Sequence, residues 1–320
     1  MPRIVVLDGY TLNPGDNPWD PVAAMGELTV HDRTPPPLIV ERSAGREIVL
    51  TNKTPLTRET ISALPELRMI GVLATGYNIV DIPAARERGI LVCNVPEYGS
   101  TTVAQFTFAL ILELCHQVGA HAQSVKSGQW QRNSDWCYWN SPQVELAGKT
   151  LGIVGFGRIG RNVGHIGHAM GMRVIAFDRV QANPPGYQPF AFKSLDELVA
   201  ESDILTLHCP QTPQNTGMIN AALLSRMKPT AFLINASRGG LVSEPDLADA
   251  LARGAIAAAA VDVVSTEPIQ PDNPLLGARN CLITPHMAWA TLEARRRIMA
   301  TTADNIAAFL GGSPRNVVNP

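Results

Sequence analysis

Cysteines are few in this 320-residue sequence, and their arrangement excludes two kinds of protein. The five are scattered, with no C-x-x-C pair among them: Cys93, Cys115, Cys137, Cys209 and Cys281. An odd, scattered set does not build the disulfide framework of a small secreted domain, and it does not supply a zinc site. We therefore expect free thiols in a reducing compartment, a cytoplasmic protein and no bound metal.

Charge and long apolar runs are also scarce. Charged residues make up 17% of the chain and the formal net charge is −2, which gives no reason to expect a nucleic acid or an anionic membrane as partner. The apolar run near the N-terminus is far too short for a signal peptide. The most apolar helical stretch, 103–115, is interrupted by Gln105, Thr107 and Glu113, so we expect no membrane-spanning helix.

The chain does contain a regular alternation of short apolar runs with helical segments, over a length that suffices for two domains. The runs expected as strands are 4–7, 48–50, 69–72, 90–92, 151–154, 174–177, 204–207, 231–234, 257–261 and 282–284. Such alternation is typical of parallel sheets with right-handed crossovers, and so predicts an α/β fold. We expect the first hundred residues to form a small flavodoxin-like domain. An amphipathic helix at 292–310 could pack back onto this domain and make it discontinuous in the sequence.

Three glycines at G-x-G-x-x-G spacing stand near the middle of the chain. Gly155, Gly157 and Gly160 follow the apolar run 151–154 and open a helical segment. In a dinucleotide site the first glycine permits the tight strand-to-helix turn, the second lets a pyrophosphate approach the backbone, and the third lets the helix lie close on the sheet. Glycines at this spacing also occur in structural βαβ units that hold no ligand, so the context decides the interpretation.

The context of these glycines favours a nicotinamide dinucleotide. The N–H groups of Arg158 and Ile159 stand at the expected helix start, where phosphates bind. Asp178 ends the next apolar run, about twenty residues further on, where a carboxylate accepts bonds from ribose hydroxyls. That carboxylate repels a 2′-phosphate, which favours NAD over NADP. Arg179 follows directly and could tolerate the phosphate, so NADP stays an alternative.

Three later strand ends carry polar groups suited to one reaction. Parallel strands direct their carboxyl ends to one edge of a sheet, where the reactive residues of such folds lie. Arg238, Glu267 and His286 each follow one of three consecutive apolar runs. Taken singly, each has a simpler explanation, as a surface cation, a solvated acid and a structural histidine.

Taken together, the three residues fit hydride transfer to a 2-oxo acid beside a nicotinamide. His286 would donate a proton to the forming alkoxide. Glu267 would orient His286 and favour its protonated form. Arg238 would hold the substrate carboxylate and polarise the oxo group. These three residues form our predicted catalytic set.

Two further features have a structural explanation beside a functional one. His208 ends a strand at the same edge, and we expect it to pack a loop. The segment 117–141 breaks the alternation and carries Trp130, Trp136 and Trp139 among polar residues. These side chains either pack the segment onto its own domain or form a contact between two copies of the chain.

The ordered motifs resemble those of the D-isomer-specific 2-hydroxyacid dehydrogenases over essentially the whole chain. The matching blocks are GFGRIG with Asp178, INASRGG, AAVDVVSTEP and NCLITPHMAWAT. The last block and the short chain are most similar to the glycerate dehydrogenase/hydroxypyruvate reductase branch. The resemblance implies a Rossmann-type NAD-binding domain, 99–290, inserted in a smaller flavodoxin-like α/β substrate domain, 1–98 plus 291–320. It also implies that the substrate lies in the cleft between the two domains.

The resemblance assigns roles to residues that their own chemistry does not single out. Thr75 and Gly76 would bind the substrate carboxylate through their backbone N–H groups. Thr102 would lie beside the nicotinamide, and Ala236 and Asp262 would contact its ribose or carboxamide. The catalytic residues of the family correspond to the three already named.

The resemblance leaves the substrate open. Hydroxypyruvate/D-glycerate and glyoxylate/glycolate are the expected pairs, and a larger 2-oxo acid is an alternative. Formate dehydrogenases carry Gln where Glu267 stands, and phosphoglycerate dehydrogenases often add regulatory domains. Corepressors of this fold retain the catalytic residues, so a dinucleotide-sensing binding protein is the other alternative. Members of the family are typically homodimers, and the segment 117–141 lies where their dimer arm sits.

Overall fold

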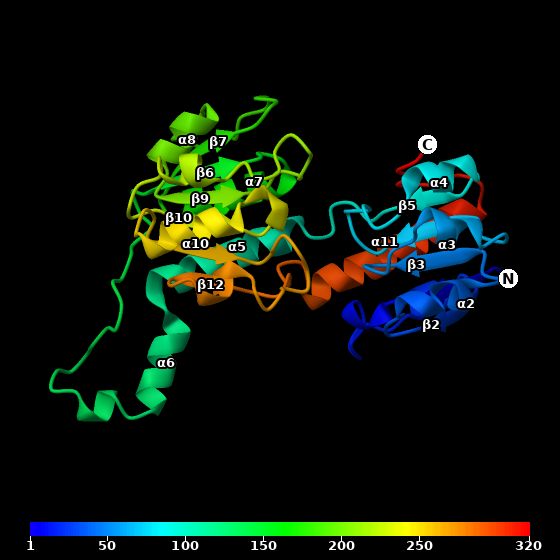
Figure 1. Cartoon of the computed structure of the whole chain (residues 1–320), viewed down its shortest axis with the longest axis horizontal. Coiled ribbons are helices and arrows are strands. Elements are labelled where there is room, and N and C mark those ends of the chain that lie inside the picture. The colour runs from blue at the N-terminus through cyan, green and yellow to red at the C-terminus, as the bar shows by residue number, and fades with distance from the viewer. The chain divides into compact units, whose positions relative to one another are not determined.

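The structure is a computed structural model that describes all 320 residues. The chain divides into two compact units. The first unit consists of Met1–Gly99 and Ala290–Pro320, and the second of Ser100–Trp289. Each unit is built around its own parallel β-sheet, so the α/β fold expected from the alternating pattern is confirmed (Figure 1).

The first unit contains a five-stranded sheet in the order β2-β1-β3-β4-β5. Its strands are β1 (Arg3–Val6), β2 (Glu27–Val30), β3 (Ile48–Thr51), β4 (Met69–Val72) and β5 (Leu91–Cys93). All neighbouring strands are parallel. This is the flavodoxin-like strand order, in which ligands bind beyond the carboxyl ends of the strands. Every residue of β3 and β4 is buried, as expected where helices cover both faces of a sheet.

The helices of the first unit are short, apart from the last. They are α1 (Asp20–Ala23), α2 (Ile39–Ser43), α3 (Arg58–Ser62), α4 (Ile82–Glu87) and α11 (Leu292–Leu310). The sequence specifies three of their starts, because Thr57, Asp81 and Thr291 accept hydrogen bonds from backbone N–H groups of the first turn. The long helix α11 packs against β4 and α1, which joins the C-terminal segment to the first ninety-nine residues.

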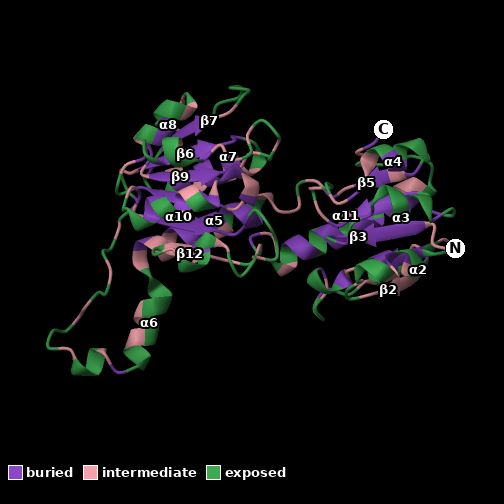
Figure 2. Cartoon of the chain, viewed as in Figure 1, coloured by how far each residue is buried: buried purple, intermediate pink, exposed green.

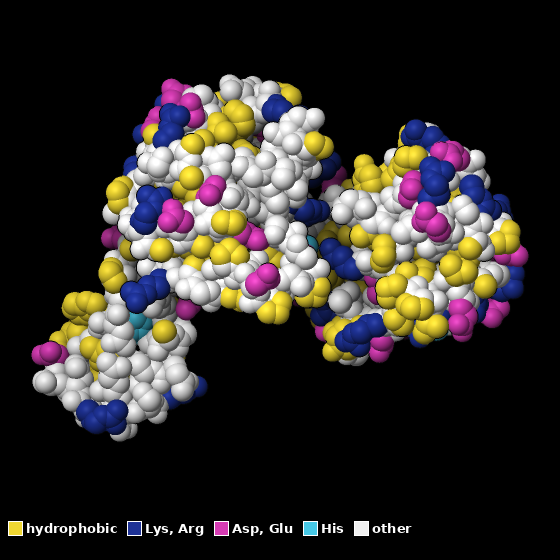
Figure 3. Space-filling model, in the orientation of Figure 1, with side chains coloured by type: hydrophobic (Ala, Val, Ile, Leu, Met, Phe, Trp, Pro, Cys, Tyr) yellow, Lys and Arg dark blue, Asp and Glu magenta, His cyan; other side chains and the backbone are white.

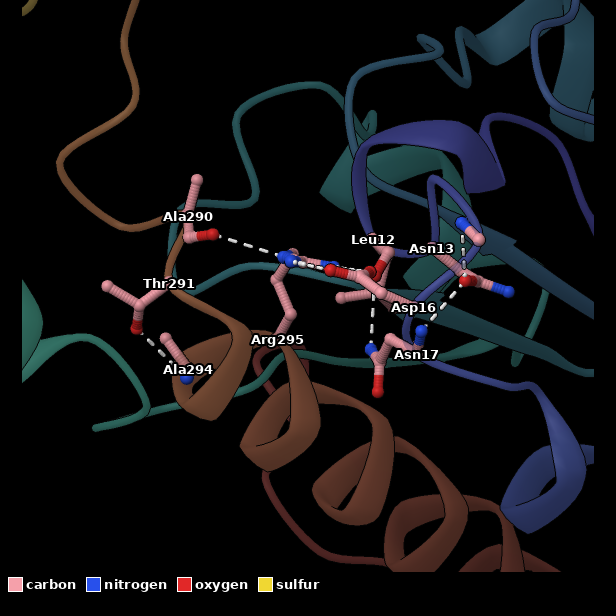
Figure 4. A network of polar contacts seen from close by, with 9 residues as sticks. Leu12, Asn13, Asp16, Asn17, Ala290, Thr291, Ala294 and Arg295 are labelled. Carbon is pink, nitrogen blue, oxygen red and sulfur yellow. Dashed lines mark hydrogen bonds and ion pairs between the residues drawn. The ribbon is translucent and has the colours of Figure 1, made fainter.

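A buried arginine fastens the start of α11 to the loop after β1. Arg295 binds both carboxylate oxygens of Asp16, at 2.5 and 2.7 Å. It also donates to the carbonyl oxygens of Ala290, at 3.0 Å, and Leu12, at 3.3 Å (Figure 4). The neighbouring Asn17 donates to the same Leu12 carbonyl. One guanidinium thus orders two segments that are almost 280 residues apart in the chain.

The second unit contains a seven-stranded sheet in the order β12-β11-β10-β9-β6-β7-β8. Its strands are β6 (Thr150–Val154), β7 (Arg173–Phe177), β8 (Phe190–Phe192), β9 (Ile204–Leu207), β10 (Phe232–Asn235), β11 (Ala258–Val261) and β12 (Cys281–Ile283). The first six strands in chain order follow the Rossmann arrangement, and β12 extends it. The order reverses between β6 and β9, so the carboxyl end of β6 is the point where this architecture binds ligands.

Alternate residues along the strands of the second unit enter two separate cores. Ile175 belongs to one core, whereas Val174 and Ala176 belong to the other. Successive side chains of a strand point to opposite faces, so the two cores lie on opposite sides of the sheet. Figure 2 shows the inner strands β6, β9, β10 and β11 as buried along their whole length.

Helices enclose the sheet of the second unit. They are α5 (Ser100–His116), α6 (Val118–Lys126), α7 (Arg158–Ala169), α8 (Leu195–Glu201), α9 (Ala221–Leu224) and α10 (Glu244–Ala252). The apolar helix α5 packs on α7 and on β10 and β11. No single helix is long and apolar enough to cross a membrane; only α5 and α6 taken together, across a bend of 54°, reach that length and apolarity.

The segment 117–141 begins with helix α6 and extends away from the sheet of the second unit (Figure 1). No residue of α6 is buried. Trp130, Trp136 and Trp139 are exposed by 51%, 86% and 67%. These exposed fractions exclude the expectation that the tryptophans pack the segment onto its own domain.

Candidate active site

The three glycines after β6 have three different environments. Gly155 has a φ of +92°, and a Cβ there would lie 2.6 Å from the Cys209 nitrogen. A Cβ at Gly160 would lie 2.1 Å from the Gly155 oxygen, so this glycine lets α7 lie on the strand end. A Cβ at Gly157 would meet nothing within 4 Å. The first and third glycines therefore serve close packing, and the second faces open space.

The start of α7 fits a dinucleotide pyrophosphate. Gly157 is the N-cap residue and no side chain caps the helix. Arg158 and Ile159 follow as the first two residues of the helix. The positive end of the helix dipole therefore faces the open space over Gly157, where an anionic group is favoured.

Asp178 lies beside this turn, directly after β7. Its carboxylate accepts hydrogen bonds from the backbone N–H of Phe156, at 2.7 Å, and of Val180, at 3.1 Å. Arg161 on α7 lies with its guanidinium carbon 4.8 Å from the centroid of the Phe156 ring. The same guanidinium donates to the carbonyl oxygens of Asn183 and Ala182, in the loop that follows Asp178. The loop that borders the expected ribose site is thus held from two sides.

The carboxyl end of β10 carries Ala236 and Arg238. Asn235 accepts from the Ser237 N–H and donates to the Arg238 carbonyl, which shapes the turn. The Ser237 hydroxyl donates to the Cys209 carbonyl, at 2.7 Å, and so joins this turn to the end of β9. Arg238 itself is exposed, and its Nη1 donates to the Ser237 carbonyl. An exposed guanidinium at a strand end is suited to binding a carboxylate from solvent.

His286 and Glu267 meet across the ends of the two neighbouring strands β12 and β11. His286 Nδ1 lies 2.6 Å from Glu267 Oε2, with 25% and 34% of the two side chains exposed. The other carboxylate oxygen of Glu267 accepts from the Val264 N–H, at 3.3 Å. A carboxylate can only accept here, so the neutral or charged imidazole donates from Nδ1 and presents Nε2 to other groups. The pair is the arrangement of an oriented proton donor.

The backbone at His286 is unusual as well. Its φ is +52°, a left-handed conformation that non-glycine residues adopt rarely. The His286 N–H donates to the carbonyl oxygens of Asp262 and Thr284, at 2.7 and 3.0 Å, and these bonds hold the turn. Strained backbone of this kind is concentrated at functional sites.

Asp262 is buried and supports the same turn. Its carboxylate accepts from the Thr284 hydroxyl at 2.6 Å, and from the N–H groups of Met287 and Ala288, at 2.9 and 2.8 Å. Burial raises the pKa of Asp262, and these hydrogen bonds, together with the charge of His286, oppose that rise. The structure therefore places this side chain under the His286 turn.

Thr75 and Gly76 follow β4 in the first unit. The Thr75 hydroxyl donates to the Val95 carbonyl at 2.8 Å, and the Thr75 carbonyl accepts from the Asn94 amide. These bonds give the exposed turn a defined backbone. Thr102 belongs to the second unit, where it is buried in the first turn of α5.

Sequence reasoning missed two residues that support the site. Thr284 holds the Asp262 carboxylate, and Glu244, at the start of α10, binds the turn that precedes Glu267. An acidic residue in the first turn of a helix is common for reasons of the helix dipole, so the pattern alone did not distinguish Glu244. A threonine before Pro-His carries no sequence signal either.

The comparisons with known proteins identify the family of the chain. Residues 108–288 match the family model "D-isomer specific 2-hydroxyacid dehydrogenase, NAD binding domain". The chain is 50% identical over 320 residues to a hydroxypyruvate reductase of Blautia hydrogenotrophica, covering 99% of both chains. It is 40% identical over 285 residues to a glycerate dehydrogenase of Methylorubrum extorquens, covering 88% of both.

A solved structure has the same fold along the whole chain. This is an NADPH-dependent glyoxylate/hydroxypyruvate reductase of Sinorhizobium meliloti in complex with citrate, 28% identical, with a TM-score of 0.85. The similarity covers 100% of this chain and 99% of that one. The expected family and the expected NAD-binding Rossmann domain are confirmed. The chain belongs to the D-isomer-specific 2-hydroxyacid dehydrogenases, with its NAD-binding domain between residues 108 and 288.

Proposed function

We propose that this protein reduces hydroxypyruvate to D-glycerate with NADH, and glyoxylate to glycolate as a second reaction. The observation that supports the reaction type is the His286–Glu267 pair. This pair lies at the edge of the sheet where the glycine turn, residues 155–160 after β6, also lies. The choice of substrate is supported by the similarity to a hydroxypyruvate reductase over 99% of both chains.

In the proposed reaction, a reduced dinucleotide held through its pyrophosphate at the start of α7 would supply a hydride to the oxo carbon of the substrate. His286 donates the proton from Nε2 to the oxygen that becomes the hydroxyl, and Glu267 keeps Nδ1 engaged during the transfer. Proton and hydride together convert the 2-oxo acid into the 2-hydroxy acid. Oxidation of the product follows the same path in reverse, with His286 accepting the proton.

Arg238 is the proposed ligand of the substrate carboxylate and of the polarised oxo group. We further propose that the backbone N–H groups of Thr75 and Gly76 bind the same carboxylate, and that the first unit is the substrate domain. Thr102 and Ala236 are proposed contacts of the nicotinamide half of the cofactor. Asp262 then acts through the turn that it supports, besides any contact with the cofactor.

We propose NADH as the preferred cofactor because the Asp178 carboxylate lies where an adenosine ribose binds. A 2′-phosphate there would meet a negative charge whose oxygens are held in place by the Phe156 and Val180 N–H groups. Arg179, next in the chain, is the residue through which NADPH could still be used. Replacing Asp178 by Ser should lower the preference for NADH over NADPH by about tenfold or more, equivalent to one lost or gained charged contact.

The test is the loss of NADH absorbance with hydroxypyruvate, glyoxylate, pyruvate and a branched 2-oxo acid, repeated with NADPH. Hydroxypyruvate should give the highest kcat/KM. His286→Asn should lower kcat by about 10²–10⁴-fold, the usual contribution of a positioned general acid. Arg238→Gln should raise KM as well as lower kcat. NADH binding, followed by fluorescence, should be unchanged in both variants.

Three results would contradict the proposal. Full activity of His286→Asn would exclude the proton donor. Tight NADH binding with no turnover of any acid would indicate a dinucleotide-sensing protein, and preference for the branched acid would move the activity to a larger substrate.

We also propose that the protein is a cytoplasmic homodimer that associates through the segment 117–141. The five thiols are free, as is usual in a reducing compartment. Figure 3 shows hydrophobic side chains gathered on the projecting part of the second unit. Exposed aromatic residues of this kind are enriched where protein surfaces meet.

A further inference from the structure

Glu244 is a buried carboxylate without a cationic partner. Only 8% of the residue is exposed, and no salt bridge involves it. Its Oε1 accepts from the Ser265 N–H at 2.6 Å. Its Oε2 accepts from the Ser265 hydroxyl at 2.8 Å and from the Asn273 amide at 2.9 Å. Burying a charge against neutral donors alone costs folding free energy. A carboxylate kept in such a place therefore indicates that its hydrogen bonds serve the protein in another way.

All three donors belong to the connection between β11 and β12, which carries Glu267 near its beginning. His286 follows β12, the strand at the end of this connection. The Val264 N–H donates to the Glu267 carboxylate and closes a turn, and Ser265 lies within this turn. Asn273 starts the 3-10 helix η5 (Pro274–Gly277), because its Oδ1 accepts from the Leu275 N–H. Glu244 therefore fastens two points of this connection, Ser265 near its beginning and Asn273 near its middle, to the start of α10.

The turn is also held from the side of β10. A Cβ at Gly239 would lie 1.9 Å from the carbonyl carbon of Val264, so the backbones of the two turns are in direct contact. The Glu267 turn is thus fixed on one side by the turn after β10 and on the other by Glu244. Glu267 then contacts His286 with its Oε2 oxygen.

We propose that Glu244 is a positioning residue for proton transfer, which holds the Ser265 turn so that Glu267 stays against His286. The inference rests on the proposed function, because it acts through the proton donor named there. Glu244 does not itself touch the reacting groups. A displacement of catalytic groups by about 1 Å can lower turnover by about a hundredfold.

The first variant is Glu244→Gln, which keeps the shape of the side chain. The new amide can still accept from the Ser265 N–H, but its NH2 group faces the Asn273 amide, which is also a donor. We expect kcat with hydroxypyruvate to fall about 10–100-fold. The Kd of NADH should stay within about twofold, because the glycine turn is untouched. Ser265→Ala removes a single bond and should have a smaller effect on kcat.

The decisive variant is the double change Glu244→Gln/Asn273→Asp, which exchanges the donor and the acceptor. The new carboxylate at position 273 can accept from the new amide at 244 and still cap η5. We expect it to recover at least tenfold of the lost kcat. Asn273→Asp alone places two carboxylates at one contact and should lower kcat, because like charges repel there.

The pH dependence of kcat/KM gives a readout that a loss of general stability would not move. Two carboxylates face His286: Glu267 at its Nδ1, and the buried Asp262 beneath its turn. In general, a carboxylate held close to a cationic acid favours the charged form of that acid. The alkaline fall in reduction rate should therefore move to lower pH in Glu267→Gln, and in the same direction by a smaller amount in Glu244→Gln.

Each outcome separates the two proposals. If His286→Asn and Glu267→Gln are as active as the wild type, the proposed function fails. If both lose activity but Glu244→Gln has wild-type kcat and an unchanged pH profile, only the positioning role is wrong. Loss of kcat in Glu244→Gln without recovery in the double variant also overturns it. Recovery together with return of the pH profile supports it.

Discussion

At the scale of single residues, His208 is partly buried and lacks a full set of partners. Its Nε2 lies 2.8 Å from the Thr206 hydroxyl, while its Nδ1 is buried without a hydrogen bond. Burial lowers the pKa of His208 to about 3. The loop-packing role expected for this residue is consistent with these contacts, because its neighbour Cys209 lies against Gly155.

His208 should make the free energy of unfolding depend on pH. Above pH 6.5, neither the folded nor the unfolded state binds the proton, so there is no effect. Between pH 6.5 and about 3, the unfolded state binds it and the folded state does not, so stability falls by up to about 1.4 kcal/mol per pH unit. Urea unfolding at pH 7, 6 and 5 should show a smaller loss in His208→Asn. Equal slopes in the two proteins would contradict this account.

Substitution of Arg295 should lower the free energy of unfolding more than substitution of Asp16, and a double-mutant cycle can compare the two effects. Only 9% of the Arg295 side chain is exposed, against 48% for Asp16. Arg295→Met leaves the Ala290 carbonyl oxygen without a donor and removes one of the two donors to the Leu12 carbonyl, the other being Asn17, which should lower the free energy of unfolding by about 2 kcal/mol. Asp16→Asn should have little further effect in that background. Urea unfolding of the two single variants and the double variant checks this, and additive effects would exclude the coupling.

At the scale of elements, the glycine turn combines two functions that substitution can separate. Gly160→Ala brings a methyl group against the Gly155 carbonyl and should destabilise the protein by about 1–3 kcal/mol. Gly157→Ala meets no atom, so its thermal midpoint should be unchanged. Its methyl group occupies the space that the pyrophosphate needs, so the Kd of NADH should rise about tenfold or more. Equal losses of stability in the two variants would show that the distinction is wrong.

Elements also differ in how well the sequence predicts them. Strands buried on both faces, such as β3, β4 and β9, consist almost entirely of apolar residues. The predicted runs match β4 and β9, and the run 48–50 ends one residue before β3 does. The strands β2 and β8 were not predicted. Both lie at sheet edges, are three or four residues long and have partly exposed side chains, so no apolar run marks them.

The helix α6 was missed for another reason. Its sequence, Val118–Lys126, contains a glycine and no buried residue, so it shows no apolar stripe. It begins after Gln117, whose left-handed backbone conformation separates α6 from α5 and changes the direction of the chain. The segment therefore appeared from the sequence to be irregular, although its first part is helical.

At the scale of the whole molecule, the projecting segment should determine the oligomeric state. Replacing Trp136 and Trp139 by Ser should weaken the proposed dimer at least about thirtyfold, since each buried interface tryptophan contributes on the order of 2 kcal/mol. Val40→Ser, which removes an exposed apolar side chain from the first unit, is the control. Sedimentation velocity over a range of concentrations measures the effect. An unchanged dimer in the tryptophan variant, or a monomeric wild type, would contradict the proposed interface.

The family and the type of chemistry were determined by the sequence alone. Glycine spacing, Asp178 and the three strand-end residues are local signals, because a parallel strand followed by a loop always delivers its next residues to the same edge of the sheet. The predicted helix 292–310 coincides with α11 for a similar reason, since Thr291 caps it and its apolar positions recur with helical period. The roles of the predicted site residues remain predictions.

Only the tertiary structure decided which distant residues meet. The contact between Glu267 and His286 spans 19 residues, and that between Glu244 and Asn273 spans 29. Arg295 and Asp16 are 279 residues apart. Such pairs depend on strand order and on the course of the connecting loops, which no local pattern encodes. The sequence therefore determined which residues could perform the chemistry, and the packing of the chain determined which neighbours hold them in place.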